Sequence, residues 1–142
     1  MIMNKESMAN DFWCGIDSND PRHIRKTYMM LVSSGSLNNL IGIPPWPKIK
    51  KFLARCWREA FLHPKDTNVA IGLNGYEAAL DFCPFLANGN GIKGYDEKGR
   101  HYLIQMLHDV YENGDNDSRL CIETAIVEGF SDSDLKYWRK CN

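Results

Sequence analysis

The stretch that decides the fold is WPKIKKFLARCWREAFL, residues 46–62. Its apolar side chains recur every three or four residues, which is the spacing of one face of an α-helix. They are Trp46, Ile49, Phe52, Leu53, Cys56, Trp57, Ala60 and Phe61. Pro47 suits a first helical turn, where its missing N–H costs no hydrogen bond, and His63-Pro64 ends the pattern. The sequence therefore predicts a helix over 47–62 with a broad apolar stripe.

Five other stretches of the chain show helical periodicity. They are predicted as helices over 21–33, over 75–83, over 98–112, from Asp117 or Ser118 to near Gly129, and from Ser131 toward the last residues. Alternating apolar and polar runs, the pattern of half-buried strands, are almost absent. The sequence therefore predicts an all-α fold, a single multi-helix domain of about six helices over residues 1–142.

Residues with capping or helix-breaking chemistry mark the ends of these predicted helices. Asp20 precedes Pro21, which is the pattern of an N-cap followed by proline at the first helical position. The other signals are two capping boxes, Asn74 with Glu77 and Ser131 with Asp134, and Pro84, which is expected to stop the helix over 75–83.

Three segments show no helical pattern. Residues 1–19 are predicted to be a loosely packed N-terminal segment, in which Met8, Phe12 and Trp13 form a short turn. The run over 69–73 fits a strand and a loop packed inward equally well. Residues 88–94 contain three glycines in seven residues and are predicted to be a mobile connector.

Length and composition favour a soluble globular protein. With 142 residues the chain fits one domain, and 44% hydrophobic residues can supply its core. The first residues lack the apolar run of a signal peptide, and the longest uncharged stretch, 27–47, is broken by Gly, Asn and Pro. Five cysteines at irregular spacing argue against a disulfide scaffold. We therefore expect a reduced, cytoplasmic protein that does not span a membrane.

The net charge of −1 hides two blocks of opposite sign. From residue 21 to 58 there is no acid, and the cations are Arg22, Arg25, Lys26, Lys48, Lys50, Lys51, Arg55 and Arg58. From residue 109 to 134 only Arg119 opposes the acids Asp109, Glu112, Asp115, Asp117, Glu123, Glu128, Asp132 and Asp134. The two blocks either attract each other within the fold or leave one of them free to steer a partner of opposite charge.

No metal-binding or catalytic motif stands out. Zinc ligands normally come in close pairs, whereas His101 and His108 lie seven residues apart, about 10 Å along a helix. His108 with Asp109, or Glu123 with a facing helix, would act as an acid–base pair only in a cleft that shifts their pKa values. Exposed helix surface is the simpler interpretation. We therefore predict no catalytic residue, no metal, no cofactor and no small-molecule substrate.

The cysteines are expected to be structural. Cys56 and Cys121 fall on apolar stripes and are predicted to be buried and inert, whereas Cys141 is predicted to be exposed. An enzyme whose catalytic group is assembled only in the folded state is the third hypothesis for this chain, behind the two that follow.

The basic segment 22–58 is the best argument for nucleic-acid binding. Its lysines and arginines could neutralise phosphates, and Trp46 could stack on a base. Against this, Trp57 and Phe61 fall on the apolar stripe, the acidic block would repel a polyanion, and the pI of about 6.4 is low for such a binder. A small nucleic-acid-associated or phage or plasmid accessory protein is therefore the alternative hypothesis.

The acidic block supports a different partner, a basic protein. Clustered carboxylates imitate phosphate spacing, speed encounter and pair with the cations that a nuclease uses on its substrate. The acids predicted to contact such a partner are Asp109, Glu112, Asp115, Asp117, Glu123 and Glu128. An ordinary solvated helix face would have the same composition, so this remains a hypothesis.

The end of the chain resembles a known group of proteins. The run CIETAIVEGF, residues 121–130, followed by a capped final helix, resembles the ending of small bacterial immunity proteins. That group neutralises interbacterial toxins, including those of contact-dependent growth inhibition. The resemblance covers about twenty residues and implies a short, cytoplasmic, non-enzymatic protein. It also implies a tight one-to-one complex that blocks a toxin, but it assigns no functional residue.

Overall fold

The computed structural model describes residues 13–33 and 43–141, and within these ranges the chain forms helices and no strand. The α-helices are α2 (Pro21–Val32), α3 (Trp46–Leu62), α4 (Gly75–Asn88), α5 (Glu97–Asn113), α6 (Asn116–Ala125) and α7 (Asp132–Lys140). Three short 3-10 helices are η1 (Cys14–Asp17), η3 (Gly89–Gly91) and η4 (Val127–Gly129). The predicted all-α fold of about six helices is confirmed. The turn predicted for Met8 and Phe12 lies outside the described residues.

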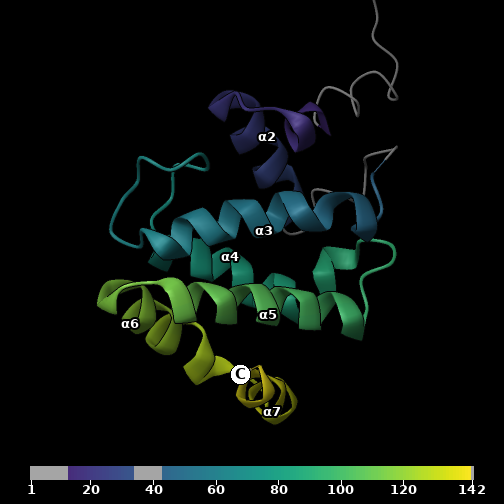
Figure 1. Cartoon of the computed structure of the whole chain (residues 1–142). Helices are drawn as coiled ribbons and strands as arrows, with labels where there is room; N and C mark the ends of the chain where they lie inside the picture. The colour runs from purple at the N-terminus through teal and green to yellow at the C-terminus, as the bar shows by residue number, and fades with distance from the viewer. Residues whose placement is uncertain (1–12, 34–42, 142) are drawn as a thin grey trace, which may run out of the picture.

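Helix α3 is the centre of the fold. In Figure 1 it lies between α2 and α5, with α4 behind, and α6 and α7 lie beyond α5. All eight residues of its predicted apolar stripe are buried, and Ile49, Leu53 and Phe61 have no exposed area. None of the helices in the described ranges is both long enough and apolar enough to cross a bilayer.

Trp57 is the hub of the core. It is 0% exposed and meets the rings of Phe82 and Phe85 edge-on, with centroids 5.0 Å and 5.4 Å away. Its Nε1 donates to the hydroxyl of Tyr28 at 3.0 Å, and that hydroxyl donates to Oδ2 of Asp81 at 2.8 Å. Burial raises the pKa of Asp81 and of Tyr28. One hydrogen-bonded chain thus joins polar side chains of α2, α3 and α4.

Most of the local helix signals act as predicted. The Asp20 side chain accepts from the backbone N–H of Arg22 at 3.0 Å and caps α2. Asn74 and Glu77 form a complete capping box at the start of α4, with bonds of 2.8 Å and 3.2 Å. Ser131 caps α7 by accepting from the N–H of Asp134, but the Asp134 carboxylate pairs with Arg100 and does not complete the predicted capping box.

Three helix boundaries differ from the prediction. The helix that was predicted to stop near Gly129 is α6, which ends at Ala125 and is followed by the separate 3-10 helix η4. Pro84 does not stop α4 but lies inside it, because Phe85 and Leu86 are buried in the core and hold the last turn in place. The cap of α6 is Asp115, whose Oδ1 accepts from the N–H of Ser118 at 2.9 Å, so neither Asp117 nor Ser118 starts the helix.

Residues 69–73 and 88–94, two of the segments predicted to lack a helical pattern, pack against the helices. Residues 69–73 form turns, and Val69 and Ile71 are buried, so the inward-packed loop is the correct alternative. In the predicted connector, the Nδ2 of Asn90 donates to the carbonyls of Leu31 and Ser33 at 2.9 Å and 3.2 Å. This connector is therefore anchored to the end of α2.

Candidate protein-binding site

A hollow of about 410 Å³ opens where α5, α6 and α7 meet. Its lining combines carboxylates with aromatic rings, and we call it the acidic hollow. It is formed by His108, Tyr111, Glu112, Glu123, Val127, Trp138 and Arg139. Two of the six predicted partner-binding acids, Glu112 and Glu123, therefore meet at one concave surface.

Helix α5 forms one wall because His108, Tyr111 and Glu112 are three and four residues apart and share a helix face. His108 is only 6% exposed, and its Nε2 lies 3.7 Å from Oε1 of Glu112. The ring of Trp138 packs edge-on against His108 at 4.9 Å and against Tyr111 at 5.5 Å. These contacts give the hollow an aromatic floor below its carboxylates.

The position of Trp138 depends on how α7 docks onto α5. The ring of His101 stacks on Tyr137, with centroids 3.8 Å apart and planes at 2°. Nε of Arg100 lies 3.0 Å from Oδ1 of Asp134 in an ion pair that is mostly shielded from water. The two histidines of α5 thus pack α7 in place.

Among the described residues, no group of three His, Cys, Asp or Glu side chains is placed to hold a metal ion.

The acidic hollow brings charged groups of both signs beside aromatic rings. Glu123 accepts a hydrogen bond from the hydroxyl of Tyr111, and this bond raises the pKa of Tyr111. The guanidinium of Arg119 already lies 5.8 Å from the Tyr111 ring centroid. Arg139 also lines the hollow, so its two carboxylates lie near two guanidiniums, those of Arg119 and Arg139. Carboxylates beside aromatic faces are a suitable environment for a further Lys or Arg side chain.

Two other predicted acids lie at a second hollow of about 330 Å³ at the start of α6. Asp115 is occupied as the helix cap, and its bond from the N–H of Ser118 lowers its pKa. Oδ1 of Asp117 lies 3.4 Å from Nζ of Lys65. Both carboxylates therefore already have partners within the chain.

The last two predicted acids line neither hollow. Oδ1 of Asp109 accepts from Nε2 of Gln105 at 3.3 Å, and Glu128 is exposed on η4. The sequence predicted one binding surface of six acids. The structure instead places two at the acidic hollow, two at the second hollow and two at neither. Sequence reasoning missed Tyr111 and Trp138. The helical spacing of Tyr111 from His108 could have predicted that Tyr111 lies on the same face. Trp138 could not be predicted in this way, because it reaches the hollow only through the docking of α7.

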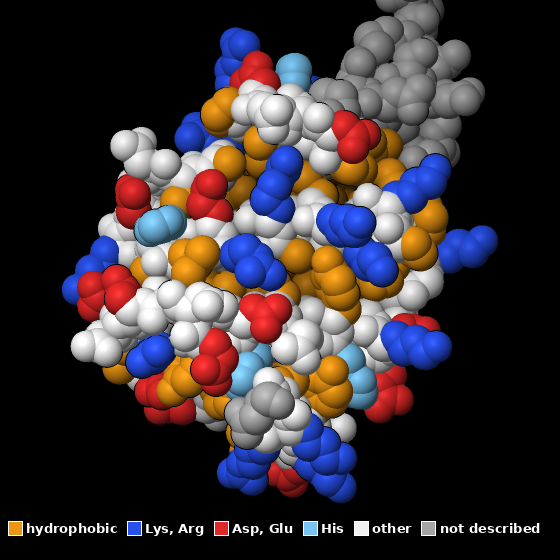
Figure 2. Space-filling view, in the orientation of Figure 1, with side chains coloured by type: hydrophobic (Ala, Val, Ile, Leu, Met, Phe, Trp, Pro, Cys, Tyr) orange, Lys and Arg blue, Asp and Glu red, His pale blue; other side chains and the backbone are white. Residues whose placement is uncertain are grey.

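The basic block lies on a different part of the surface. In Figure 2, Lys and Arg side chains gather over α3, whereas carboxylates are scattered over the face. Arg22 pairs with Asp20, Arg25 donates to the carbonyl of Ala70, and Arg55 donates to that of Ser18. None of these three arginines therefore forms an ion pair with the acids of residues 109–134.

The predicted stacking of Trp46 on a nucleic-acid base is wrong. Trp46 is 5% exposed and packs edge-on against Tyr95 and Tyr102, with centroids 4.9 Å and 6.2 Å away. The periodicity that placed it on the apolar stripe of α3 also takes it into the core. The exposed face of α3 offers cations, namely Lys48, Lys51, Arg55 and Arg58, and no accessible ring from Trp46.

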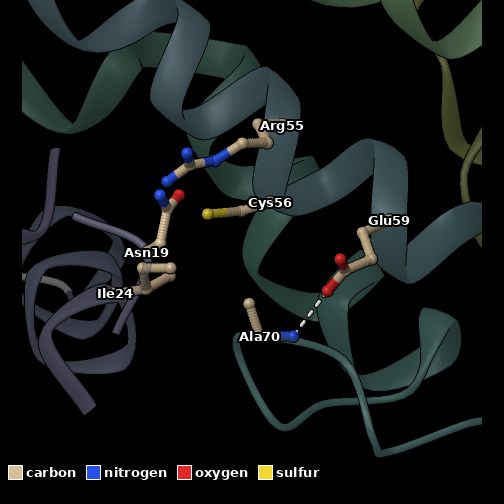
Figure 3. A pocket seen from close by; sticks show the side chains of 6 residues that line it. All are labelled: Asn19, Ile24, Arg55, Cys56, Glu59 and Ala70. Atoms are coloured by element: carbon tan, nitrogen blue, oxygen red, sulfur yellow. Dashed lines mark hydrogen bonds between the residues drawn. The ribbon is translucent and has the colours of Figure 1, made fainter. Parts of the chain in front are cut away.

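A third hollow, of about 200 Å³, contains a cysteine thiol. Figure 3 shows the thiol of Cys56 directed into it from α3, between Arg55 and Glu59. Burial raises the pKa of Cys56 to about 12, so the thiolate that a nucleophile requires is disfavoured. Glu59 accepts from the N–H of Ala70, which fixes the loop that closes the hollow. Arg55 and Glu59 of this hollow therefore already bind backbone groups of the chain.

The other cysteines are also shielded to different degrees. Cys121 is buried, and burial raises its pKa to about 11. Cys141 is half-buried and not exposed as predicted, because its Sγ donates to the carbonyl of Tyr137 at 3.3 Å. Cys83 is also half-buried.

Native alkylation with iodoacetamide is expected to leave Cys56 and Cys121 unmodified while Cys83 and Cys141 react. Thiols with little thiolate and no solvent access react slowly. The measurement is peptide mass spectrometry after timed quenching, with urea-unfolded protein as the control in which all cysteines react. Labelling of Cys56 as fast as Cys141 in the native protein would contradict its burial.

Comparison of the chain with protein-family models, curated proteins and solved structures gave no match.

Proposed function

We propose that this protein is a non-enzymatic immunity protein that neutralises a basic bacterial toxin, such as a nuclease, by forming a stoichiometric complex in the cytoplasm. The observation that carries the proposal is the acidic hollow, in which Glu112 and Glu123 stand beside the rings of Tyr111 and Trp138. Aromatic anchors with flanking charges are the composition of protein-binding hot spots.

The charge distribution supports the same partner. Acids of α5, α6 and η4 face solvent near the hollow, and Glu112 and Glu123 are among the exposed ones. A field of this sign attracts a cationic protein and speeds its encounter. The resemblance of residues 121–130 and the final helix to the ending of immunity proteins points in the same direction.

The alternative is a nucleic-acid-associated protein that uses the exposed cations of α3. The row Lys48, Lys51, Arg55 and Arg58 favours it, because these residues share one face of the helix. The burial of Trp46 counts against it, because base stacking contributes much of single-strand affinity.

The test uses the protein encoded by the reading frame directly upstream of this chain's gene. Co-expression of the two chains is expected to restore growth that the upstream product alone arrests. Size-exclusion chromatography with light scattering should show a one-to-one complex, and its association rate should fall as salt is raised. Absence of both binding and growth rescue would contradict the proposal.

The same purified protein also tests the nucleic-acid hypothesis. Purified chain is titrated into labelled duplex and single-stranded DNA at several salt concentrations. Tight binding with a steep salt dependence, flattened by Lys51→Glu, would favour the nucleic-acid hypothesis instead.

A further inference from the structure

A further hollow of about 270 Å³ lies where α4 and α5 meet the segment between α6 and α7. Its polar lining includes Arg100 and Asp134, and its apolar lining includes Leu86, Ile126 and Phe130. We call it the Arg100 hollow. It shares no lining residue with the acidic hollow, so the two are separate sites on the molecule.

The guanidinium of Arg100 has more donors than the protein uses. Its Nε lies 3.0 Å from Oδ1 of Asp134, whose side chain is only 12% exposed, and this ion pair fixes the direction of the guanidinium. Neither Nη atom of Arg100 donates a hydrogen bond to any residue in the described ranges. Because arginine carries its donors in a planar fork, the Nη end remains available at the hollow that Arg100 lines.

The remaining lining is mostly apolar. Leu86 is 4% exposed, Ile126 has no exposed area, and Phe130 is half-buried beside them. A ligand that fits this lining carries an oxygen acceptor at one end and a short apolar group at the other. A carboxylate is the acceptor that matches the guanidinium fork, because its two oxygens accept from both Nη atoms.

The charge balance also favours a carboxylate over other charged groups. The guanidinium of Arg100 opposes a cation. The Asp134 carboxylate opposes a second anion, but its pairing with Arg100 leaves the lining close to neutral. A singly charged carboxylate therefore meets less repulsion here than a phosphate group, which carries more negative charge.

We propose that the Arg100 hollow binds a small organic acid, whose carboxylate accepts from the Nη atoms of Arg100 and whose short apolar chain packs on Leu86, Ile126 and Phe130. The volume of the hollow limits the ligand to a short chain. The ligand is bound and not chemically changed. This inference does not depend on the proposed toxin partner, because the acidic hollow lies elsewhere.

The experiment titrates hexanoate into the full chain and follows two-dimensional amide NMR spectra. Hexanoate should shift the amides of Arg100, Gly129 and Phe130 with a dissociation constant on the order of 1 mM, as expected for so small a ligand. Hexanamide has the same length without the charge, so it should bind at least about tenfold more weakly. Inorganic phosphate lacks the apolar chain and should also bind at least about tenfold more weakly.

Two variants test the site itself. Ala87→Phe narrows the hollow at an exposed lining residue and keeps the ion pair, so it should abolish hexanoate binding without unfolding α7. Arg100→Met/Asp134→Leu should also abolish it, and removing both charges leaves no unpaired carboxylate in the α5–α7 contact. Lys98→Met is the matched control, because Lys98 is an exposed cation of α5 that does not line the hollow.

The thiol of Cys83 gives an independent readout, because Cys83 also lines the hollow. Hexanoate should slow its alkylation by iodoacetamide and leave that of Cys141 unchanged. An unchanged spectrum with hexanoate would overturn the proposal, as would equal binding of hexanoate and hexanamide. Equal binding of phosphate would show a general anion site, and equal weakening by Lys98→Met would show unspecific surface binding. Either result also overturns the proposal.

Discussion

Replacing Trp57 with alanine is expected to lower the free energy of unfolding by about 3–5 kcal/mol, the range for removing a large buried aromatic ring. The change empties the centre of the core, where Trp57 meets Phe82 and Phe85. It also removes the Nε1 donor of the hydroxyl of Tyr28. Because a domain of this size is stable by only about 5–15 kcal/mol, this one change should remove a large share of the total. Urea unfolding followed by circular dichroism gives the value.

Two further variants separate packing from hydrogen bonding. Trp57→Phe keeps most of the volume but removes the Nε1 donor and one ring of the indole, so its cost should be smaller, about 1–3 kcal/mol. Leu80→Ala is the control at an exposed position and should change stability by no more than about 0.5 kcal/mol. A loss below about 1 kcal/mol for Trp57→Ala would mean that Trp57 is not the hub of the core.

Reversing both carboxylates of the acidic hollow, Glu112→Lys with Glu123→Lys, is expected to weaken binding of the proposed toxin partner on the order of 100-fold. Each reversal places a cation where the partner's cation would approach, and Glu123→Lys also removes the hydrogen-bond acceptor of Tyr111. Most of the loss should be in the association rate and should shrink at high salt. Stopped-flow mixing with the inactive toxin at two ionic strengths measures it.

The chain offers a charge-matched control for this result. Glu128→Lys makes the same change of charge as Glu123→Lys, on an exposed residue that does not line the hollow. It should reduce the association rate much less than Glu123→Lys does. Equal effects would mean that net charge alone, and not the acidic hollow, governs the encounter.

Helix positions were predictable wherever the signal was local. The stripe of 46–62 is buried as expected, and the capping chemistry of Asp20 and of Asn74 with Glu77 works within a single turn. Pro84 was misjudged because burial of the two residues that follow outweighs the one hydrogen bond that proline removes. Asp115 was missed because Ser118 turns inward, where its hydroxyl donates to the carbonyl of Leu62 at 3.0 Å.

The candidate site was predictable only in part. A run of acids can be read from the sequence, but which of them meet depends on how α5, α6 and α7 pack. Glu112 and Glu123 are brought to one hollow, whereas Asp115 is used as a cap and Asp117 pairs with Lys65. The aromatic floor is a tertiary feature, because Trp138 reaches His108 from a helix thirty residues later in the chain.

The four tryptophans give this protein a built-in optical reporter. Trp13, Trp46 and Trp57 are buried at 8%, 5% and 0% exposure, whereas Trp138 is half-buried and lines the acidic hollow. Collisional quenchers such as the caesium ion reach only indoles near solvent, so the quenchable part of the intrinsic fluorescence belongs to Trp138. Occupation of the hollow can therefore be followed without a dye, as a loss of quenching in the unmodified protein.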